Sequence, residues 1–192
     1  MFQDILDAKR RIQPYISRTP VQQFGKTKLK REDMQPLRSY KLRGALNFML
    51  KNRPDAVICA SAGNHAQGVA YAAQVLGVSA DIVMPTCTPQ QKIEAVRRLG
   101  GNVMLHGTTY DEACAYAKER ANGRRFVHPF DDPDVIAGQG TIGLELEADT
   151  VVVPVGGGGL ISGIALAMGN VRLVAAEAAG AASLSAALSA GH

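Results

Sequence analysis

The sequence has no tryptophan, and only 5% of its 192 residues are aromatic. Its hydrophobic share of 46% therefore comes mostly from alanine, valine, leucine and isoleucine. Small aliphatic side chains of this kind suit the close-packed layers of an α/β protein better than a β-sandwich. The length is enough for one good core or for two small lobes.

Cysteine is also scarce. Cys59, Cys87 and Cys114 are odd in number, lie far apart and form no Cys-x-x-Cys pair, so neither a disulfide framework nor a zinc knuckle is predicted. A reducing compartment is the natural interpretation. The N-terminal segment lacks the apolar core of a signal peptide, and no apolar stretch is long enough for a membrane span. We expect a soluble, cytoplasmic protein with no membrane partner.

The basic residues are scattered, although the net charge is +4. Their densest run is Lys26, Lys28, Lys30 and Arg31. A nucleic-acid surface would need a basic stripe, usually with stacking aromatic residues. We therefore predict no nucleic-acid partner, and expect these charges to lie on a solvated face, with some of them meeting an anionic ligand.

Short apolar runs alternate with segments of helical periodicity along most of the chain. The predicted strands are Ala56–Ala60, Asp81–Met84, Val103–Leu105, Phe126–Val127, Thr150–Val155 and Val171–Ala176. The predicted helices are Phe2–Tyr15, Ser39–Lys51, His65–Leu76, Pro89–Leu99, Tyr110–Ala121, Ile136–Leu146 and one from Leu160. Near-continuous apolar strands separated by helices predict a parallel sheet covered by helices. We expect Arg18–Leu37 to be irregular.

Four consecutive glycines, Gly156–Gly159, stand between a predicted strand and a helix. Without Cβ atoms, their backbone N–H groups can approach an anion at the helix N-terminus, where the helix dipole favours phosphate. The alternative is a tight turn, but four glycines are costly for turning alone. The loop therefore predicts a phosphate site, although it matches neither the dinucleotide-binding nor the Walker pattern.

A second loop, Ser61–His65, also joins a strand to a helix. Its hydroxyl, amide and backbone N–H groups suit a carboxylate or a ring oxygen at the helix N-terminus. The alternative is an ordinary helix start in which Asn64 is the N-cap and His65 is structural. Taken alone, the loop favours that alternative.

A third segment, Ser39–Gly44, places Lys41 in the first turn of a helix that Ser39 could cap. A lysine there opposes the helix dipole, and the positive helix end lowers its pKa, which helps a nucleophilic amine. Gly44 early in a helix indicates a close approach of another segment. The alternative is a surface lysine.

In combination and in this order, the three loops resemble those of fold-type II pyridoxal-phosphate enzymes, and within them the threonine (serine) dehydratase, or threonine ammonia-lyase, family. The resemblance covers nearly the whole chain. The matching segments are Arg18–Pro20, Lys30–Ala45, Ala60–Ala70, Val83–Lys92, His128–Glu145, Val151–Ala165 and Ala181–Leu188.

The resemblance implies a role for each loop. Lys41 would form the Schiff base with pyridoxal 5′-phosphate and act as the catalytic base, with Tyr40 beside the cofactor ring and Asn64 at the ring hydroxyl. The phosphate would be bound by Gly156, Gly157, Gly158, Gly159 and Leu160. The substrate carboxylate would be bound by Ser61, Gly63 and His65. No metal site is implied.

The implied reaction is deamination of L-threonine or L-serine by elimination of water, which gives 2-oxobutanoate or pyruvate and ammonia. Isoleucine biosynthesis would be the context, with a small amino acid as substrate and a homo-oligomer as the assembly. Two alternatives stay open. One is a serine racemase-like enzyme with the same three loops, and the other is a non-catalytic fragment that acts as a binding module.

The implied fold is α/β and two-lobed, similar to the tryptophan synthase beta chain, with parallel sheets flanked by helices. We expect a small lobe of residues 46–137 and a large lobe of residues 1–45 and 138–192. Family connections are shortened at Val21–Leu29 and Lys51–Asp55, and the chain stops before the family's large lobe ends. We therefore expect a large lobe truncated at the C-terminus, without the residue that meets the pyridine nitrogen.

Overall fold

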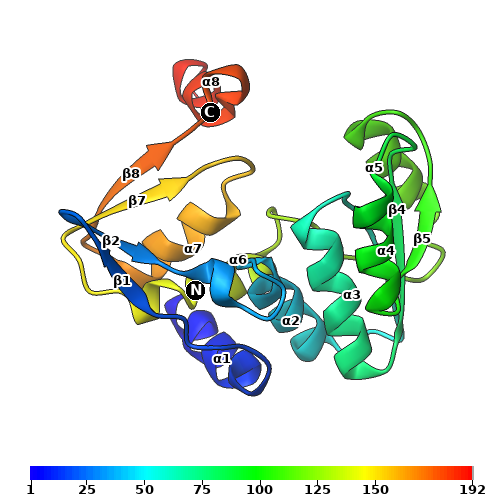
Figure 1. Ribbon diagram of the computed structural model, residues 1–192, viewed down its shortest axis with the longest axis horizontal. Helices are drawn as coiled ribbons and strands as arrows, with labels where there is room; N and C mark the ends of the chain where they lie inside the picture. Colours follow the sequence, from blue (N-terminus) through cyan, green and yellow to red (C-terminus); the bar gives the residue numbers. More distant parts are fainter. Residues whose placement is uncertain (192) are drawn as a thin grey trace.

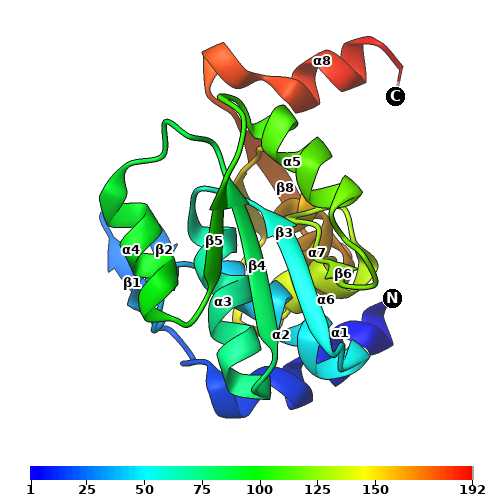
Figure 2. The same cartoon turned by 90° about the vertical axis from the view of Figure 1, so that its right-hand side faces the viewer.

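The computed structural model describes residues 1–191, and its larger sheet has four parallel strands in the order β5-β4-β3-β6. Figure 2 shows the first three side by side. This confirms the predicted parallel sheet. Its strands are β3 (Ala56–Ala60), β4 (Ser79–Met84), β5 (Asn102–Leu105) and β6 (Arg125–Phe126).

Helices cover both faces of this sheet. Val57 and Cys59 of β3 belong to one hydrophobic cluster, whereas Ile58 and Ala60 belong to another, as the two-residue period of a strand requires. The first cluster includes residues of the helices α2, α3 and α4, and the second includes residues of α5. These helices are α2 (Lys41–Asn52), α3 (Asn64–Leu76), α4 (Gln90–Arg98) and α5 (Tyr110–Glu119).

The other group of elements carries the glycine loop. It contains the parallel pair of β7 and β8, packed on α7, and lies opposite the larger sheet in Figure 1, with α2 and α6 between the two groups. Besides the intervening α6 (Pro133–Gly140), its elements are α1 (Phe2–Ile12), β7 (Thr150–Pro154), α7 (Gly159–Met168), β8 (Arg172–Ala176) and α8 (Ser183–Ser189). The division at residues 45/46 and 137/138 stays a prediction.

Glycines let α6 pack closely on both neighbouring helices. A Cβ atom on Gly138 would lie 2.5 Å from the carbonyl oxygen of Arg43 and 2.6 Å from the Cα of Gly44. On the other side of α6, a Cβ on Gly140 would lie 2.7 Å from the carbonyl oxygen of Gly163 in α7. The backbones of α2, α6 and α7 are therefore in direct contact. This confirms the close approach predicted at Gly44.

Two predictions about the elements are wrong. The stretch expected to be irregular contains an antiparallel hairpin of β1 (Val21–Phe24) and β2 (Thr27–Lys30), because Gly25, at φ +57°, allows a two-residue turn. The helix expected at Ile136–Leu146 begins earlier, since the Asp132 carboxylate accepts from the amides of Asp134 and Val135. It ends at Gly140.

Short 3₁₀ helices complete the structure at Gln13–Tyr15 (η1), Glu32–Met34 (η2), Gly143–Glu145 (η3) and Ala179–Ala181 (η4). The helix predicted over Phe2–Tyr15 is α-helical to Ile12, where α1 passes into η1. Among residues 1–191, no helix is both long and apolar enough to cross a membrane.

Candidate functional site

The structure brings the Ser61–His65 loop close to Lys41. The loop follows the carboxyl end of β3 and leads into α3, and α3 packs along α2. A Cβ on Gly68 of α3 would lie 3.2 Å from the carbonyl oxygen of Lys41. The first turn of α2 therefore touches the N-terminal part of α3, at the edge of the sheet where α/β proteins bind ligands.

Lys41 is half-buried, and its Nζ donates a hydrogen bond of 2.7 Å to the carbonyl oxygen of Pro129. Burial lowers the pKa of this amine to about 8. The amine lies 5.5 Å from the centre of the Tyr40 ring. Tyr40, not Ser39, is the N-cap of α2, although the Ser39 hydroxyl accepts from the amide of Lys41 at 3.2 Å. An amine with this pKa is a far better nucleophile near neutral pH than an exposed lysine.

A buried ion network holds the start of α2. The Arg43 guanidinium is fully buried and donates to the Glu32 carboxylate at 2.9 and 2.8 Å. It also donates to Glu145 at 2.7 and 3.3 Å and to the Thr141 hydroxyl at 3.0 Å. The Lys30 amine donates to Glu145 at 2.5 Å. Two cations thus balance two carboxylates, as burial requires, and α2 is tied to β2, η2 and η3.

The glycine loop has different structural requirements at each position. Gly158 has φ +83°, a conformation that favours glycine. A Cβ on Gly157 would lie 2.2–2.4 Å from three carbons of the Phe130 ring, and one on Gly159 would lie 2.6 Å from the carbonyl oxygen of Phe130. Gly156 is exposed, with open space where its Cβ would be. Packing and turn geometry thus account for three of the four glycines.

The start of α7 offers unpaired donors. Within residues 1–191, the amides of residues 156–161 donate no hydrogen bond to the protein, and the first bond of the helix runs from the Ser162 amide to the Gly158 carbonyl at 3.0 Å. Unpaired amides at a helix N-terminus attract anions. The geometry of the loop therefore suits a phosphate group.

The second loop does not begin its helix as the alternative interpretation required. Gly63 is the N-cap of α3, and no side chain caps this end. The Ser61 hydroxyl accepts from the Gly63 amide at 3.2 Å. Asn64 is exposed, and its side chain makes no hydrogen bond within the described chain. The Asn64 amide thus has no structural role that would compete with ligand binding.

His65 is buried, and its Nε2 lies 3.0 Å from the carbonyl oxygen of Val127. Burial, together with the nearby Lys41 and His128, lowers its pKa to about 3. The imidazole is therefore neutral, with Nε2–H as the donor and Nδ1 left without a partner among the described residues. The side chain binds the loop to Val127, directly after β6, and its expected part in substrate binding stays a prediction.

Comparison with known proteins agrees with the predicted resemblance. Residues 12–192 match the PALP family, described as pyridoxal-phosphate dependent enzymes. The chain belongs to this family.

Relatives of this pyridoxal-phosphate dependent chain include two named for threonine chemistry. Threonine dehydratase 1 biosynthetic, chloroplastic, of Solanum lycopersicum is 57% identical over 149 residues, which are 71% of this chain and 25% of that protein. L-threonine ammonia-lyase of Thermotoga maritima is 46% identical over 185 residues, which are 86% of this chain and 46% of that protein. The chain thus spans less than half the length of either relative.

Solved structures share the fold. The processed form of threonine deaminase isoform 2 from Solanum lycopersicum has a TM-score of 0.92 at 45% identity, over 100% of this chain and 59% of that one. Maize serine racemase has a TM-score of 0.93 at 36% identity, over 99% of this chain and 65% of that one. The α/β fold with helices flanking a parallel sheet is therefore that of fold-type II pyridoxal-phosphate enzymes.

Residues 127–130 were assigned no role from the sequence. The structure shows that Val127, Pro129 and Phe130 contact His65, Lys41 and the glycine loop, in that order. One signal was available in the sequence: these residues directly follow the carboxyl end of β6, where a parallel sheet places its ligand site.

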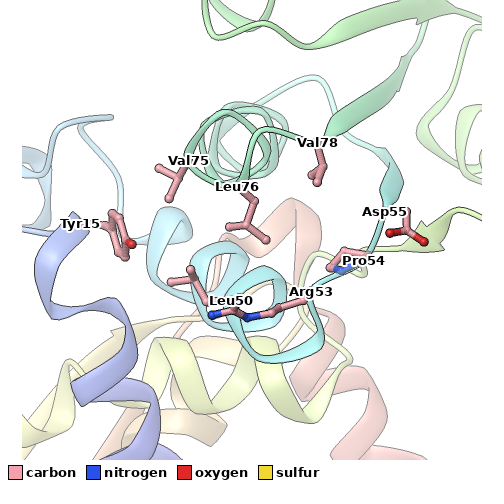
Figure 3. Close-up of a pocket in the computed structure, with 8 residues that line it drawn as sticks. All are labelled: Tyr15, Leu50, Arg53, Pro54, Asp55, Val75, Leu76 and Val78. Atoms are coloured by element: carbon pink, nitrogen blue, oxygen red, sulfur yellow. The ribbon is translucent and has the colours of Figure 1, made fainter.

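The cavity in Figure 3 is not part of this site. It has a volume of about 380 Å³, and its lining includes the apolar Leu50 and Leu76 and the charged Arg53 and Asp55. Leu50 and Leu76 lie near the carboxyl ends of α2 and α3, whereas Lys41 and Asn64 begin these helices. The cavity is therefore at the opposite end of both helices from the three loops.

Proposed function

We propose that this chain forms the cofactor-binding part of a threonine dehydratase, which converts L-threonine, and L-serine, to 2-oxobutanoate, or pyruvate, and ammonia. The observation that carries the proposal is the pairing of a lysine whose pKa burial lowers to about 8 with unpaired amides at the start of α7. Contacts of α6 with both α2 and α7 fix these groups relative to each other.

The residues present fit pyridoxal 5′-phosphate. The Lys41 amine would bind the aldehyde, and the amides of Gly156–Gly159 and Leu160 would bind the phosphate. Tyr40 would lie beside the ring, and the exposed Asn64 amide would meet the ring hydroxyl. Bound pyridoxal phosphate supplies an electron sink for negative charge at the α-carbon of an amino acid.

The substrate end of the site is assigned to the start of α3. Its unpaired amides and its helix dipole would attract the carboxylate of a small amino acid, next to Ser61, Gly63 and His65. The removal of the α-proton is assigned to the Lys41 amine, because its lowered pKa leaves a useful fraction unprotonated near neutral pH. The buried, neutral His65 is a poor proton carrier by comparison.

A direct assay tests the reaction. Protein incubated with pyridoxal phosphate and L-threonine should form 2-oxobutanoate, and Lys41→Ala should abolish this. Borohydride reduction should attach the cofactor to the peptide that contains Lys41. If wild-type protein bound pyridoxal phosphate but formed no 2-oxo acid from either amino acid, the proposed reaction would be wrong; if it also formed no D-serine from L-serine, it would be a binding module.

A second candidate is serine racemisation, because maize serine racemase matches as well in fold as threonine deaminase does. Formation of D-serine from L-serine, without pyruvate, would favour it. Two further expectations from the resemblance belong to this proposal: a homo-oligomer, to be measured by light scattering, and a cytoplasmic location.

A further inference from the structure

Residues 127–130, which we term the bridging segment, join all three loops of the site. The Val127 carbonyl oxygen lies 3.0 Å from Nε2 of His65, and the Pro129 carbonyl oxygen accepts from the Lys41 amine at 2.7 Å. The Phe130 ring packs on Gly157. Three of four consecutive residues thus contact the substrate loop, the lysine and the glycine loop.

Phe130 contacts the glycine loop at two points and in two ways. Its ring fills the space where a Cβ on Gly157 would lie, with three ring carbons at 2.2–2.4 Å from that position. Its main chain faces Gly159, with the carbonyl oxygen 2.6 Å and the Cα 3.0 Å from the corresponding Cβ position. The glycine loop therefore rests on this one residue on both sides of Gly158.

The orientation of Phe130 is itself fixed by its neighbours. Nδ1 of His128 accepts from the amides of Phe130 at 3.4 Å and Asp131 at 2.8 Å. The His128 ring also meets the Phe130 ring edge-on, with centroids 4.7 Å apart. Burial lowers the pKa of His128, which keeps Nδ1 available as an acceptor near neutral pH. The bridging segment is therefore a pre-ordered support.

We propose that Phe130 is a positioning residue for the phosphate end of the cofactor site. By packing on Gly157 and Gly159, it holds the unpaired amides of the glycine loop in the orientation that a phosphate group needs. It acts through the loop. This inference rests on the proposed function, since it concerns the same cofactor.

Two aldehydes that differ only in the phosphate group test the proposal. Apo-protein is titrated with pyridoxal 5′-phosphate and with pyridoxal, and binding is followed by absorbance. Phe130→Ala should weaken the binding of pyridoxal 5′-phosphate by about tenfold or more. The affinity for pyridoxal should stay within about twofold of the wild-type value. Phe130→Leu, which keeps most of the bulk, should recover much of the loss. Phe24→Ala, on the exposed strand β1, is the control.

A pair of glycine substitutions separates the ring from the main chain. Gly157→Ala should weaken phosphate-dependent binding in the wild type but cost little in the Phe130→Ala background, where no ring blocks the new Cβ. Gly159→Ala should weaken phosphate-dependent binding in both backgrounds, because its Cβ meets the Phe130 backbone. Thermal unfolding without cofactor checks that each variant folds.

The outcomes differ for the two proposals. Wild-type protein that binds neither aldehyde would refute the proposed function. If the wild type binds both aldehydes and Phe130→Ala loses the same affinity for each, Phe130 is only a core residue. That result would overturn this inference alone. The inference would also be overturned if Gly157→Ala weakened pyridoxal 5′-phosphate binding as much in the Phe130→Ala background as in the wild type.

Discussion

The Lys41 amine donates a 2.7 Å hydrogen bond to the Pro129 carbonyl, which lies 88 residues further along the chain. This bond spans the interval between the start of α2 and the bridging segment, and it keeps the amine partly out of water. The consequence is chemical, because burial lowers the pKa of Lys41 from 10.5 to about 8.

The reactivity of Lys41 should follow that pKa. The rate at which an amine-specific reagent modifies Lys41 in the folded protein should rise with pH about a midpoint near 8, since only the neutral amine reacts. Mass spectrometry of the Lys41 peptide over a pH series measures this. In urea-unfolded protein the midpoint should move to about 10.5, the ordinary value. The same midpoint in both states would contradict the assigned environment.

The lowered pKa of His65 predicts that the folded chain loses stability in mild acid. Its pKa is about 3 in the folded chain and 6.5 ordinarily, so between these values the unfolded chain binds a proton that the folded chain does not. Stability should therefore be intact above pH 6.5 and fall as the pH falls, by about 2 kcal/mol between pH 7 and pH 5. His65→Gln keeps a donor for Val127 and cannot titrate, so its urea-unfolding free energy should be flatter over this range. Equal slopes would speak against a buried, neutral His65.

The buried ion network predicts a large cost for one substitution. Arg43→Met leaves the carboxylates of Glu32 and Glu145 without their shared partner and should lower the unfolding free energy by about 3–5 kcal/mol. Urea unfolding at pH 7 measures this. Arg10→Met, which breaks the exposed pair with Asp7, is the control and should have little effect. Similar costs for the two would mean that the Arg43 network is solvated.

The contact between α2 and α6 predicts sensitivity to a single methyl group. Gly138→Ala places a Cβ 2.5 Å from the Arg43 carbonyl, and neither backbone can yield easily. We expect a loss of about 1–3 kcal/mol in stability, with a shift of the Lys41 midpoint, because the helix that carries this lysine must move. Gly180→Ala, with open space around it, is the control. An unchanged Lys41 midpoint would show that α6 does not position the amine.

Much of the fold was predictable because its signals are local. The apolar runs of β3 and β4 are signals of this kind, and so is Gly77, which ends the helix predicted over His65–Leu76. Each depends on neighbouring residues alone, and the structure has these elements within two residues of their predicted bounds. The hairpin at Val21–Lys30 was missed because its strands are polar and exposed, so they lack the apolar alternation that marks a strand.

The candidate site was predicted less completely. Lys41, Asn64 and the glycine loop were proposed as site residues because three loops occur together, in order. The contact of Phe130 with Gly157 joins residues from distant parts of the chain, and no local pattern encodes it. For the same reason, the sequence could suggest a close approach at Gly44 but could not name Gly138 as the neighbour.

The glycine contacts of α6 limit how this site could be redesigned. Where Gly138 meets Gly44 and Gly140 meets Gly163, backbone lies against backbone, so neither contact can be loosened by shortening a side chain of the two glycines that form it. A protein engineer who wants to widen the space around Lys41 would have to work elsewhere, at the Ser61–Asn64 loop. Helix α6, which lies between the helix of Lys41 and the helix of the glycine loop, is thus a rigid spacer of eight residues.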